Sequence, residues 1–229
     1  MAFVIKTNEG GMWIIPQVRE ALARGMSVVV VFPNGDGRLT RALEALAAEE
    51  PRLHLAQTEF NFSMRPSIKT LRGLWEVRSV LQQSRADIAL YHLYASALAV
   101  RVATLGMRLR KVHMIAGPLY LENKIIRTVE RFLLRLDTEI IGGSDFTRDY
   151  YLELGADPRH LHSVPYGADL VKFSPDVMTK TAARAALGLP ESAFVAVMVA
   201  LVYSPKSMVF PGVGIKGHEL LLTAWSTFA

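Results

Sequence analysis

Short apolar runs alternate with longer amphipathic stretches along the first 165 residues. The clearest short run is Met26–Phe32, which is rich in valine, carries no charge and predicts a buried strand. The helical stretch before it ends at Gly25, and glycine is typical of the position directly after a helix. The same alternation predicts seven strands, at 3–7, 26–32, 53–57, 88–91, 112–115, 138–141 and 161–164.

Helical stretches separate these strands. The first one ends at Arg24, and the others are expected at 39–50, 66–83, 95–105, 122–136 and 144–154. Strands that alternate with helices of this length indicate βαβ units and a parallel sheet. We therefore expect an α/β fold with a Rossmann-like doubly wound parallel sheet, in which ligands bind at the carboxyl ends of the strands.

The pattern changes after Pro165. A loop and a helix at 179–187 come first, then the apolar run Phe194–Val202, which predicts another buried strand, and then a helix at 217–228. One strand and two helices cannot cover both faces of that strand, so we expect an incomplete second Rossmann-like domain. The expected division is a first Rossmann-like domain at 1–165, a linker and helix at 166–190, and the start of a second domain at 191–229.

Composition narrows the class of protein. Hydrophobic residues make up 51% of the chain and charged residues 21%, which is typical of a globular protein. No apolar run is long enough for a membrane helix, and the first residues lack the features of a signal peptide. The absence of cysteine excludes disulfides, thiol catalysis and thiolate metal sites. A cytoplasmic location fits these features best.

Positive charge is concentrated between residues 59 and 111. This stretch holds nine Lys or Arg and three Asp or Glu, a net charge of 9 − 3 = +6, whereas the whole chain carries +5. A basic face can attract nucleic acid, anionic lipid or a phosphorylated substrate. An ordinary solvated surface explains the same charge equally well.

Several motifs of known chemistry are absent: the chain has no G-x-S-x-G, H-E-x-x-H, phosphate-binding G-x-x-x-x-G-K-[ST] or D-x-D. The segment 212–217 reads G-x-G-x-x-G, but it lies too far from a strand for a nicotinamide dinucleotide site. Its glycines and Lys216 precede a helix and would favour a diphosphate, and a plain surface loop is the alternative. His160 and His162 have no third candidate ligand, so no metal site is expected.

Four segments, in this order, resemble the retaining GT-B glycosyltransferases of family 4. They are Gly10-Gly11 with the helix-to-strand passage 21–28, the strand end 87–92, the helix start 144–147, and the segment 164–169 followed by Phe173 and Pro175. The strand at Phe194 and the pair Lys216-Gly217 resemble the beginning of the family's nucleotide-sugar domain. The resemblance extends over nearly the whole chain.

This resemblance implies two Rossmann-like domains that face a cleft, with an acceptor-side domain at 1–165 and the start of a nucleotide-sugar-binding domain at 191–229. It implies transfer of a sugar from a nucleotide-diphosphate sugar to a glycan, lipid-linked or small-molecule acceptor, with retention and without a metal or other cofactor. His92 would contact the transferred sugar or the acceptor, and Gly10 and Gly11 would let the donor phosphates or the acceptor approach. Ser144 would lie near the acceptor groove, although a plain helix cap explains it as well.

Lys216 and Gly217 would hold the donor diphosphate, and the lysine would stabilise charge on the leaving group. The chain departs from the family where an arginine is usual, near Leu201, and Lys206 is a candidate substitute. Tyr166 stands where the family has asparagine. The E-x₇-E segment of the family would lie beyond Ala229, so this chain alone is expected to be inactive.

The basic stretch gains a second interpretation from this resemblance. The helix that carries Arg65, Lys69, Arg72, Trp75 and Arg78 mixes cations with an aromatic ring, so peripheral contact with the inner face of a membrane is one hypothesis. The alternative is a solvated helix whose tryptophan packs inward. A GT-B-type nucleotide-sugar epimerase and a non-catalytic binding module remain open as functions, and a nucleic-acid partner is not expected. The sequence names neither the donor, the acceptor nor the oligomeric state.

Overall fold

The computed structural model describes residues 1–171, 173–200, 202 and 214–228. The chain divides into two compact units, Met1–Tyr166 and Gly167–Ala229. Each unit is described by itself.

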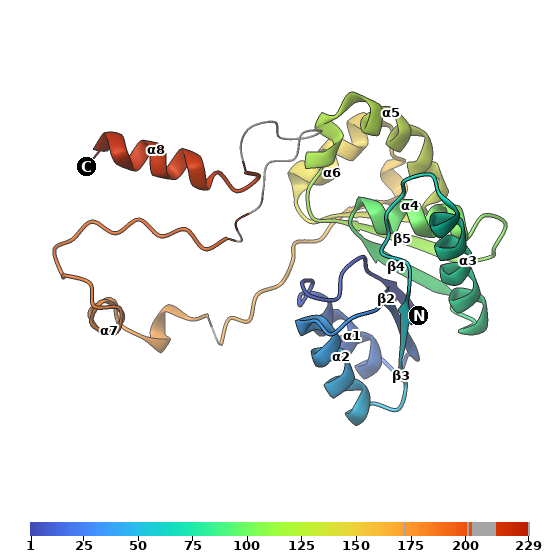
Figure 1. The fold of residues 1–229 in the computed structure, drawn as a ribbon, viewed down its shortest axis with the longest axis horizontal. Coiled ribbons are helices and arrows are strands. Elements are labelled where there is room, and N and C mark those ends of the chain that lie inside the picture. Colours follow the sequence, from blue (N-terminus) through green and yellow to red (C-terminus); the bar gives the residue numbers. More distant parts are fainter. Residues whose placement is uncertain (172, 201, 203–213, 229) are drawn as a thin grey trace. The chain divides into compact units, whose positions relative to one another are not determined.

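The first unit is built on a parallel sheet of seven strands in the order β3-β2-β1-β4-β5-β6-β7 (Figure 1). The strands are β1 (Ala2–Val4), β2 (Val28–Pro33), β3 (Leu53–Thr58), β4 (Ile88–His92), β5 (Arg110–Ile115), β6 (Glu139–Gly142) and β7 (Leu161–Ser163). The helices between them are α1 (Ile14–Ala23), α2 (Arg38–Glu49), α3 (Ile68–Gln83), α4 (Tyr94–Ala103), α5 (Lys124–Leu133) and α6 (Asp145–Leu154). The expected α/β, Rossmann-like fold is confirmed.

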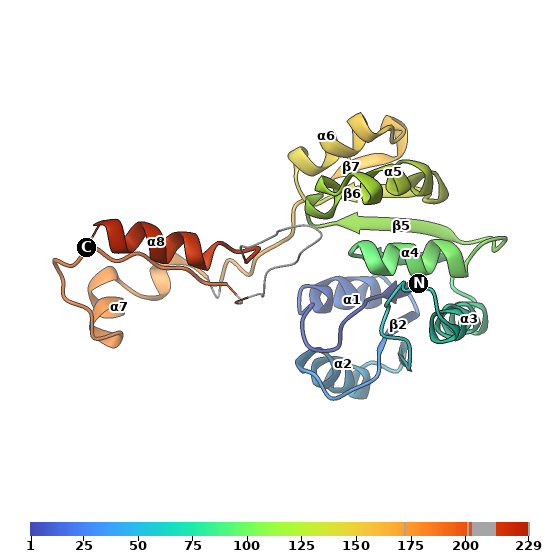
Figure 2. The same ribbon diagram turned by 45° about the horizontal axis from the view of Figure 1, so that its top comes forward.

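The helices form two layers, one on each face of the sheet (Figure 2). Successive residues of a strand point to opposite faces. Phe3 of β1 and Val30 of β2 pack with α1 and α2, whereas Val4 of β1 and Tyr91 of β4 pack with α3 and α4. Tyr91 aligns with His113 of β5, and two residues further along that face the core continues under α5 and α6. Helices α3 to α6 therefore share one layer.

The strand order creates a switch point between β1 and β4. From β1 the chain proceeds to β2 on one side, and from β4 it proceeds to β5 on the other. The loops after these two neighbouring strands therefore diverge, and the crevice outside their carboxyl ends is the usual ligand site of this architecture.

The second unit contains two helices in its described residues, α7 (Lys180–Ala186) and α8 (His218–Phe228). The strand expected at 194–202 is wrong for the residues that can be assessed, because 194–200 and 202 form no strand. Phe194, Val197 and Val199 are exposed to solvent. A strand needs a hydrogen-bonded neighbour, and the described residues of this unit contain no other strand that could pair with it.

Candidate functional site

The loop after β1 forms one wall of the switch point. The hydroxyl of Thr7 accepts hydrogen bonds from the backbone N–H groups of Glu9 and Gly10, both at 3.3 Å. Gly11 has a φ of 85°, in the left-handed region that favours glycine. A Cβ atom at Gly10 would meet no atom within 4 Å, so the loop is open on that side. Gly11 thus permits the turn, whereas Gly10 leaves open space at the surface of the loop.

The helices that follow β1 and β4 differ from the neighbouring helices in how their N-termini are capped. Helices α1 and α4 begin without a side-chain cap. By contrast, the carboxylate of Glu9 accepts a hydrogen bond from the backbone N–H of Arg38 at the start of α2, and Ser67, Asn123 and Ser144 cap α3, α5 and α6. The N-terminus of a helix favours an anion when no side chain of its own occupies it. The start of α4 meets this condition. At the start of α1 the backbone N–H groups of Ile14 and Ile15 donate to the carbonyls of Gly11 and Met12, and Pro16 has no N–H, so α1 does not offer an anion site.

His92 is the last residue of β4 and is fully buried. Its Nε2 lies 3.0 Å from Oε1 of Gln17, and its Nδ1 lies 3.2 Å from the hydroxyl of Tyr166. The amide nitrogen of Gln17 in turn points at the sulfur of Met114, 3.6 Å away, so its oxygen faces the imidazole. In this arrangement Nε2 donates to Gln17, and the hydroxyl of Tyr166 donates to Nδ1.

The surroundings of His92 keep its imidazole neutral. Burial lowers the pKa of His92 to about 3, with a smaller contribution from the nearby charge of His113. The ring also packs against Trp13, with 4.1 Å between the ring centroids. Directly after His92 the chain turns through Leu93, which has a φ of 69° and leads into α4. A neutral, firmly held imidazole at this edge can donate or accept one hydrogen bond, but it brings no charge.

Tyr166 is the second hydrogen-bonding partner of His92. Its hydroxyl reaches His92, and its ring lies so close to Gly143 that a Cβ there would stand 3.0 Å from Cε2 of the ring. Burial raises the pKa of Tyr166 to about 12, so the hydroxyl keeps its proton. Sequence reasoning noted Tyr166 only as a departure from the family. It did not find Gln17, which lies 75 residues from His92 in sequence.

The remaining candidate residues lie elsewhere. Ser144 caps α6, since its hydroxyl accepts a hydrogen bond from the backbone N–H of Thr147 at 3.2 Å. Lys216 is exposed just before α8, and Gly217 has a φ of 72°. Both belong to the second unit, whereas His92 belongs to the first. Lys206 lies outside the described residues.

A buried charged cluster lies on the opposite face of the sheet. Arg101 of α4 donates hydrogen bonds to both carboxylate oxygens of Glu130, at 2.7 and 2.9 Å, and to Asp137 at 2.9 and 2.5 Å. Tyr91 donates to the same Asp137, and Nη2 of Arg101 lies 3.1 Å from Nδ1 of His113. All of these side chains are inaccessible to solvent or nearly so. This cluster ties α4, α5, β5 and the start of β6 together.

The cluster corrects the interpretation of the basic stretch 59–111. Arg101 belongs to that stretch, but it is fully buried and contributes nothing to a basic surface. Burial alone would raise the pKa of Asp137, but hydrogen bonds from Arg101 and His113 outweigh it and lower the pKa. One sequence signal was available, because Arg101 interrupts the otherwise uncharged helix Tyr94–Ala103.

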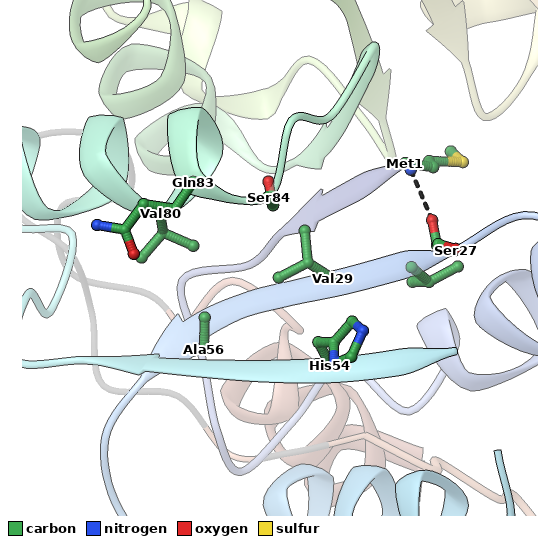
Figure 3. A pocket seen from close by; sticks show the side chains of 9 residues that line it. Met1, Ser27, Val29, His54, Ala56, Val80, Gln83 and Ser84 are labelled. Carbon is green, nitrogen blue, oxygen red and sulfur yellow. Dashed lines mark hydrogen bonds between the residues drawn. The ribbon is translucent and has the colours of Figure 1, made fainter. Parts of the chain in front are cut away.

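A hollow at the opposite edge of the sheet does not belong to the switch point. It has a volume of about 440 Å³ and is lined by Met1, Ser27, His54 and Gln83 among others (Figure 3). These residues stand at the amino ends of β1, β2 and β3 and at the end of α3. Within this lining the α-amino group of Met1 donates to the carbonyl of Ser27 at 2.7 Å.

No group of three or more His, Asp or Glu side chains in the described part of the chain is arranged to hold a metal ion. His160 and His162 do point the same way, as expected for alternate residues beside a strand, and both approach Glu139, at 3.3 and 2.8 Å. Hydrogen bonds from the two histidines lower the pKa of Glu139, that from His162 having the larger effect.

Comparison with known sequences assigns the chain to a family. The sequence profile described as Glycosyltransferase Family 4 matches residues 15–172. The match covers more than half of the 229 residues, so the chain belongs to this family. No curated protein sequence matches the chain.

Solved structures share the fold at low sequence identity. A glycosyltransferase from Rickettsia africae ESF-5 is 14% identical, with a TM-score of 0.63 over 99% of this chain and 56% of that one. Anabaena Alr3699/HepE in complex with UDP is 16% identical, with a TM-score of 0.59 over 82% and 49%. A UDP-N-acetylglucosamine 2-epimerase is 15% identical, with a TM-score of 0.50 over 71% and 47%. The chain spans about half the length of these structures.

Proposed function

We propose that this chain is the acceptor-side part of a glycosyltransferase that moves a sugar from a nucleotide-diphosphate sugar to an acceptor with retention of configuration. The observation that supports this most directly is His92, which is held neutral at the carboxyl end of β4, beside the switch point. Membership of Glycosyltransferase Family 4 agrees with the proposal.

In this proposal the open side of Gly10 gives room to an anionic substrate group, and the uncapped start of α4 gives it positive potential. Nδ1 of His92 would accept a hydrogen bond from a hydroxyl of the sugar or the acceptor in place of the hydroxyl of Tyr166, because Tyr166 is the partner at the edge of the site. Such a neutral hydrogen bond orients a hydroxyl without the cost of burying a charge. No metal ion is required for this role.

The donor side is proposed to involve Lys216 and Gly217 at the start of α8, with Lys206 as an additional candidate. A UDP-sugar is the first donor to test, because Anabaena Alr3699/HepE was solved with UDP and with UDP-glucose. Since the chain spans about half of the structures it resembles, turnover by the 229-residue chain alone is not expected. A glycan, a lipid-linked molecule or a small molecule remains the proposed acceptor.

The experiment compares His92→Gln with His54→Gln, whose histidine is exposed at the opposite edge of the sheet. Calorimetry with UDP and UDP-glucose, and product analysis with a panel of acceptors, would be carried out on the full-length protein. We expect wild type and His54→Gln to behave alike and His92→Gln to lose transfer. Equal turnover in all three proteins would contradict the role of His92, and binding without turnover on any acceptor would favour a non-catalytic module.

A nucleotide-sugar epimerase is the second candidate, and the structural similarity to a UDP-N-acetylglucosamine 2-epimerase favours it. An epimerase converts its nucleotide-sugar without any acceptor. Incubating UDP-N-acetylglucosamine with the full-length protein and analysing the sugar by NMR would separate the two. An epimerised product formed in the absence of acceptor would replace the transferase proposal.

Peripheral membrane contact through the stretch 59–111 also remains a proposal. Helix α3 exposes Ile68, Leu71 and Trp75, with Trp75 71% accessible, so the alternative in which Trp75 packs inward is wrong. Arg65, Lys69 and Arg72 are exposed on the same stretch. Vesicle binding by a Trp75→Ser variant would test this surface.

A further inference from the structure

The glycine loop after β1, residues 7–11, caps a helix that lies further along the chain. The backbone carbonyl of Asn8 accepts hydrogen bonds from the N–H groups of Leu39 and Thr40, at 3.0 and 3.3 Å, in the first turn of α2. The first N–H groups of a helix have no partner inside the helix, and no side chain at the start of α2 caps them. The glycine loop therefore supplies the acceptors that α2 lacks.

Glu9 makes a second connection between the loop and the same helix. Its Oε2 accepts a hydrogen bond from the backbone N–H of Arg38 at 3.0 Å, and its Oε1 accepts one from Nε of the same arginine at 2.8 Å. These two hydrogen bonds, the backbone one first, lower the pKa of Glu9, so the carboxylate stays ionised. An exposed ion pair contributes little to stability by itself, but here it also fixes the position of the residue before Gly10.

Gly37, directly before α2, lets the two segments come this close. A Cβ atom at Gly37 would stand 2.1 Å from the carbonyl oxygen of Asn8 and 2.8 Å from the backbone nitrogen of Glu9. Both are backbone atoms, which cannot turn away as the end of a side chain can. Any side chain at Gly37 would therefore push the glycine loop away from α2.

The turn between β2 and α2 also holds the side chain of Asn8. Nδ2 of Asn8 donates to the carbonyl of Asn34 at 3.1 Å, and the hydroxyl of Thr40 donates to the carbonyl of Gly35 at 2.8 Å and closes this turn. Asn8 is thus held through both its backbone and its side chain. Gly10 lies two residues further on, so its position is set from α2 although the loop leads into α1.

We propose that Glu9 and Gly37 are positioning residues of the substrate site: they fasten the glycine loop to α2, so that the backbone at Gly10 is in place before an anionic group of the substrate arrives. This inference rests on the proposed function, which puts that group at the open side of Gly10. Glu9 and Gly37 act through the backbone of residues 8–10. Because the loop is ordered when the protein folds, substrate binding does not have to order it.

The first test is steady-state kinetics of the full-length protein with UDP-glucose and an acceptor that it uses. The loop variants are Glu9→Ala and Gly37→Ala. Two controls match what Glu9→Ala removes: Glu20→Ala removes an exposed ion pair, with Arg24 on α1, and Ser67→Ala removes the cap of α3. We expect both loop variants to raise the KM of one substrate about tenfold with kcat within about twofold of the wild type, and the controls to change neither. Glu9→Gln keeps an oxygen for the N–H of Arg38 and should restore most of the KM.

The second test does not need turnover. Amide hydrogen exchange of residues 7–11 and 38–40 reports whether the loop and α2 are fastened together. We expect exchange there to be about tenfold faster in Glu9→Ala and Gly37→Ala, as for the loss of about one hydrogen bond, and unchanged in both controls. Equal exchange in the wild type and the loop variants would overturn the inference.

The outcomes separate this inference from the proposed function. If the wild type transfers sugar and the loop variants keep its KM, the inference is wrong and the proposed function stands. If Ser67→Ala raises KM as much as Glu9→Ala, the effect is one of general stability, and the inference is again wrong. If the wild type transfers no sugar, the proposed function is contradicted, and calorimetry with UDP then decides: equal affinity in the wild type and the loop variants, or no binding at all, would overturn the inference. Circular dichroism identifies any variant that fails to fold, and Glu9→Ala changes only an exposed side chain.

Discussion

His92 and His113 are both fully buried, on neighbouring strands of one sheet, yet they are held in opposite ways. His92 is the last residue of β4, faces α1 and has neutral partners, Gln17 and Tyr166. His113 lies within β5, faces the other layer and contacts Arg101 and two carboxylates.

The difference shows that burial alone does not identify a functional histidine. The charged cluster around His113 is enclosed by α4, α5 and α6 and offers no approach to a substrate, so its role is to join elements of the core. His92 has a strand end, a glycine loop with open space and the uncapped start of α4 beside it. Position at the carboxyl edge, rather than burial, makes His92 the candidate.

The largest expected effect is a loss of stability when the buried charged cluster around Arg101 is disrupted. Replacing Arg101 with Met would leave Glu130 and Asp137 buried without their cation, and we expect the free energy of unfolding to fall by about 3–5 kcal/mol. Urea denaturation followed by circular dichroism measures this change. A loss below about 1 kcal/mol would mean that the cluster is not a structural joint. A triple variant that also carries Glu130→Gln and Asp137→Asn should recover part of the loss.

The second-largest expected effect is on sugar transfer and concerns His92. In the full-length protein we expect His92→Gln to lower transfer about 10²-fold, the order of magnitude for the loss of one positioned hydrogen-bonding group in an active site. Steady-state kinetics measures it, with the unfolding free energy as the control. Unchanged transfer in this variant would remove His92 from the proposed site. If turnover fell only in proportion to the loss of folding stability, His92 would have the same structural role as His113.

A pH dependence of stability separates the two histidines further. The folded protein keeps His92 neutral with a pKa of about 3, while the unfolded chain binds the proton near pH 6.5. The unfolded state therefore binds more protons between these values, and stability falls as the pH is lowered below 6.5. From pH 6.5 to pH 5 we expect His92 to contribute a loss of about 2 kcal/mol.

The measurement is urea denaturation at several pH values on wild type and His92→Gln, because acidic groups contribute a similar trend to both proteins. The wild type should show the steeper decline, and the difference between the two curves belongs to His92. Parallel curves would show that the imidazole is not held neutral by the fold.

The smallest expected effect is that of Tyr166→Phe. It removes the hydroxyl that donates to Nδ1 of His92, and we expect a loss of about 1 kcal/mol in the free energy of unfolding. Tyr94→Phe is the matched control, since in the described residues the Tyr94 ring stacks on Tyr120 but its hydroxyl makes no hydrogen bond. NMR of the imidazole nitrogens should show a shift for Tyr166→Phe and none for Tyr94→Phe. The reverse pattern would contradict the assigned tautomer.

Much of the first unit could be predicted from the sequence, because its signals are local. Apolar runs such as Val28–Phe32 bury both faces of a strand inside the sheet, and helices with a 3.6-residue period cover them. The strand that ends at His92 and the glycine loop after β1 follow from the same reading, since strand ends and turns have their own sequence signals.

The sequence alone could not give the partners of these residues. Gln17 and Tyr166 lie 75 and 74 residues from His92, and only the tertiary packing of α1 and of the segment after β7 brings them to one imidazole. The apolar run at 194–202 shows the opposite case: its pattern is that of a strand, but a strand needs hydrogen-bonding neighbours, and the described residues supply none.

The sequence by itself determined the class of fold, the place of His92 at a strand end and the glycines beside it, because periodicity and turn preference act within a few residues. Only the tertiary structure decided that Arg101 is buried rather than part of a basic surface and that His92 is neutral. These properties depend on which groups meet across the sheet. Charge, burial and hydrogen bonding are set by neighbours in space, and the chain order of the residues does not contain them.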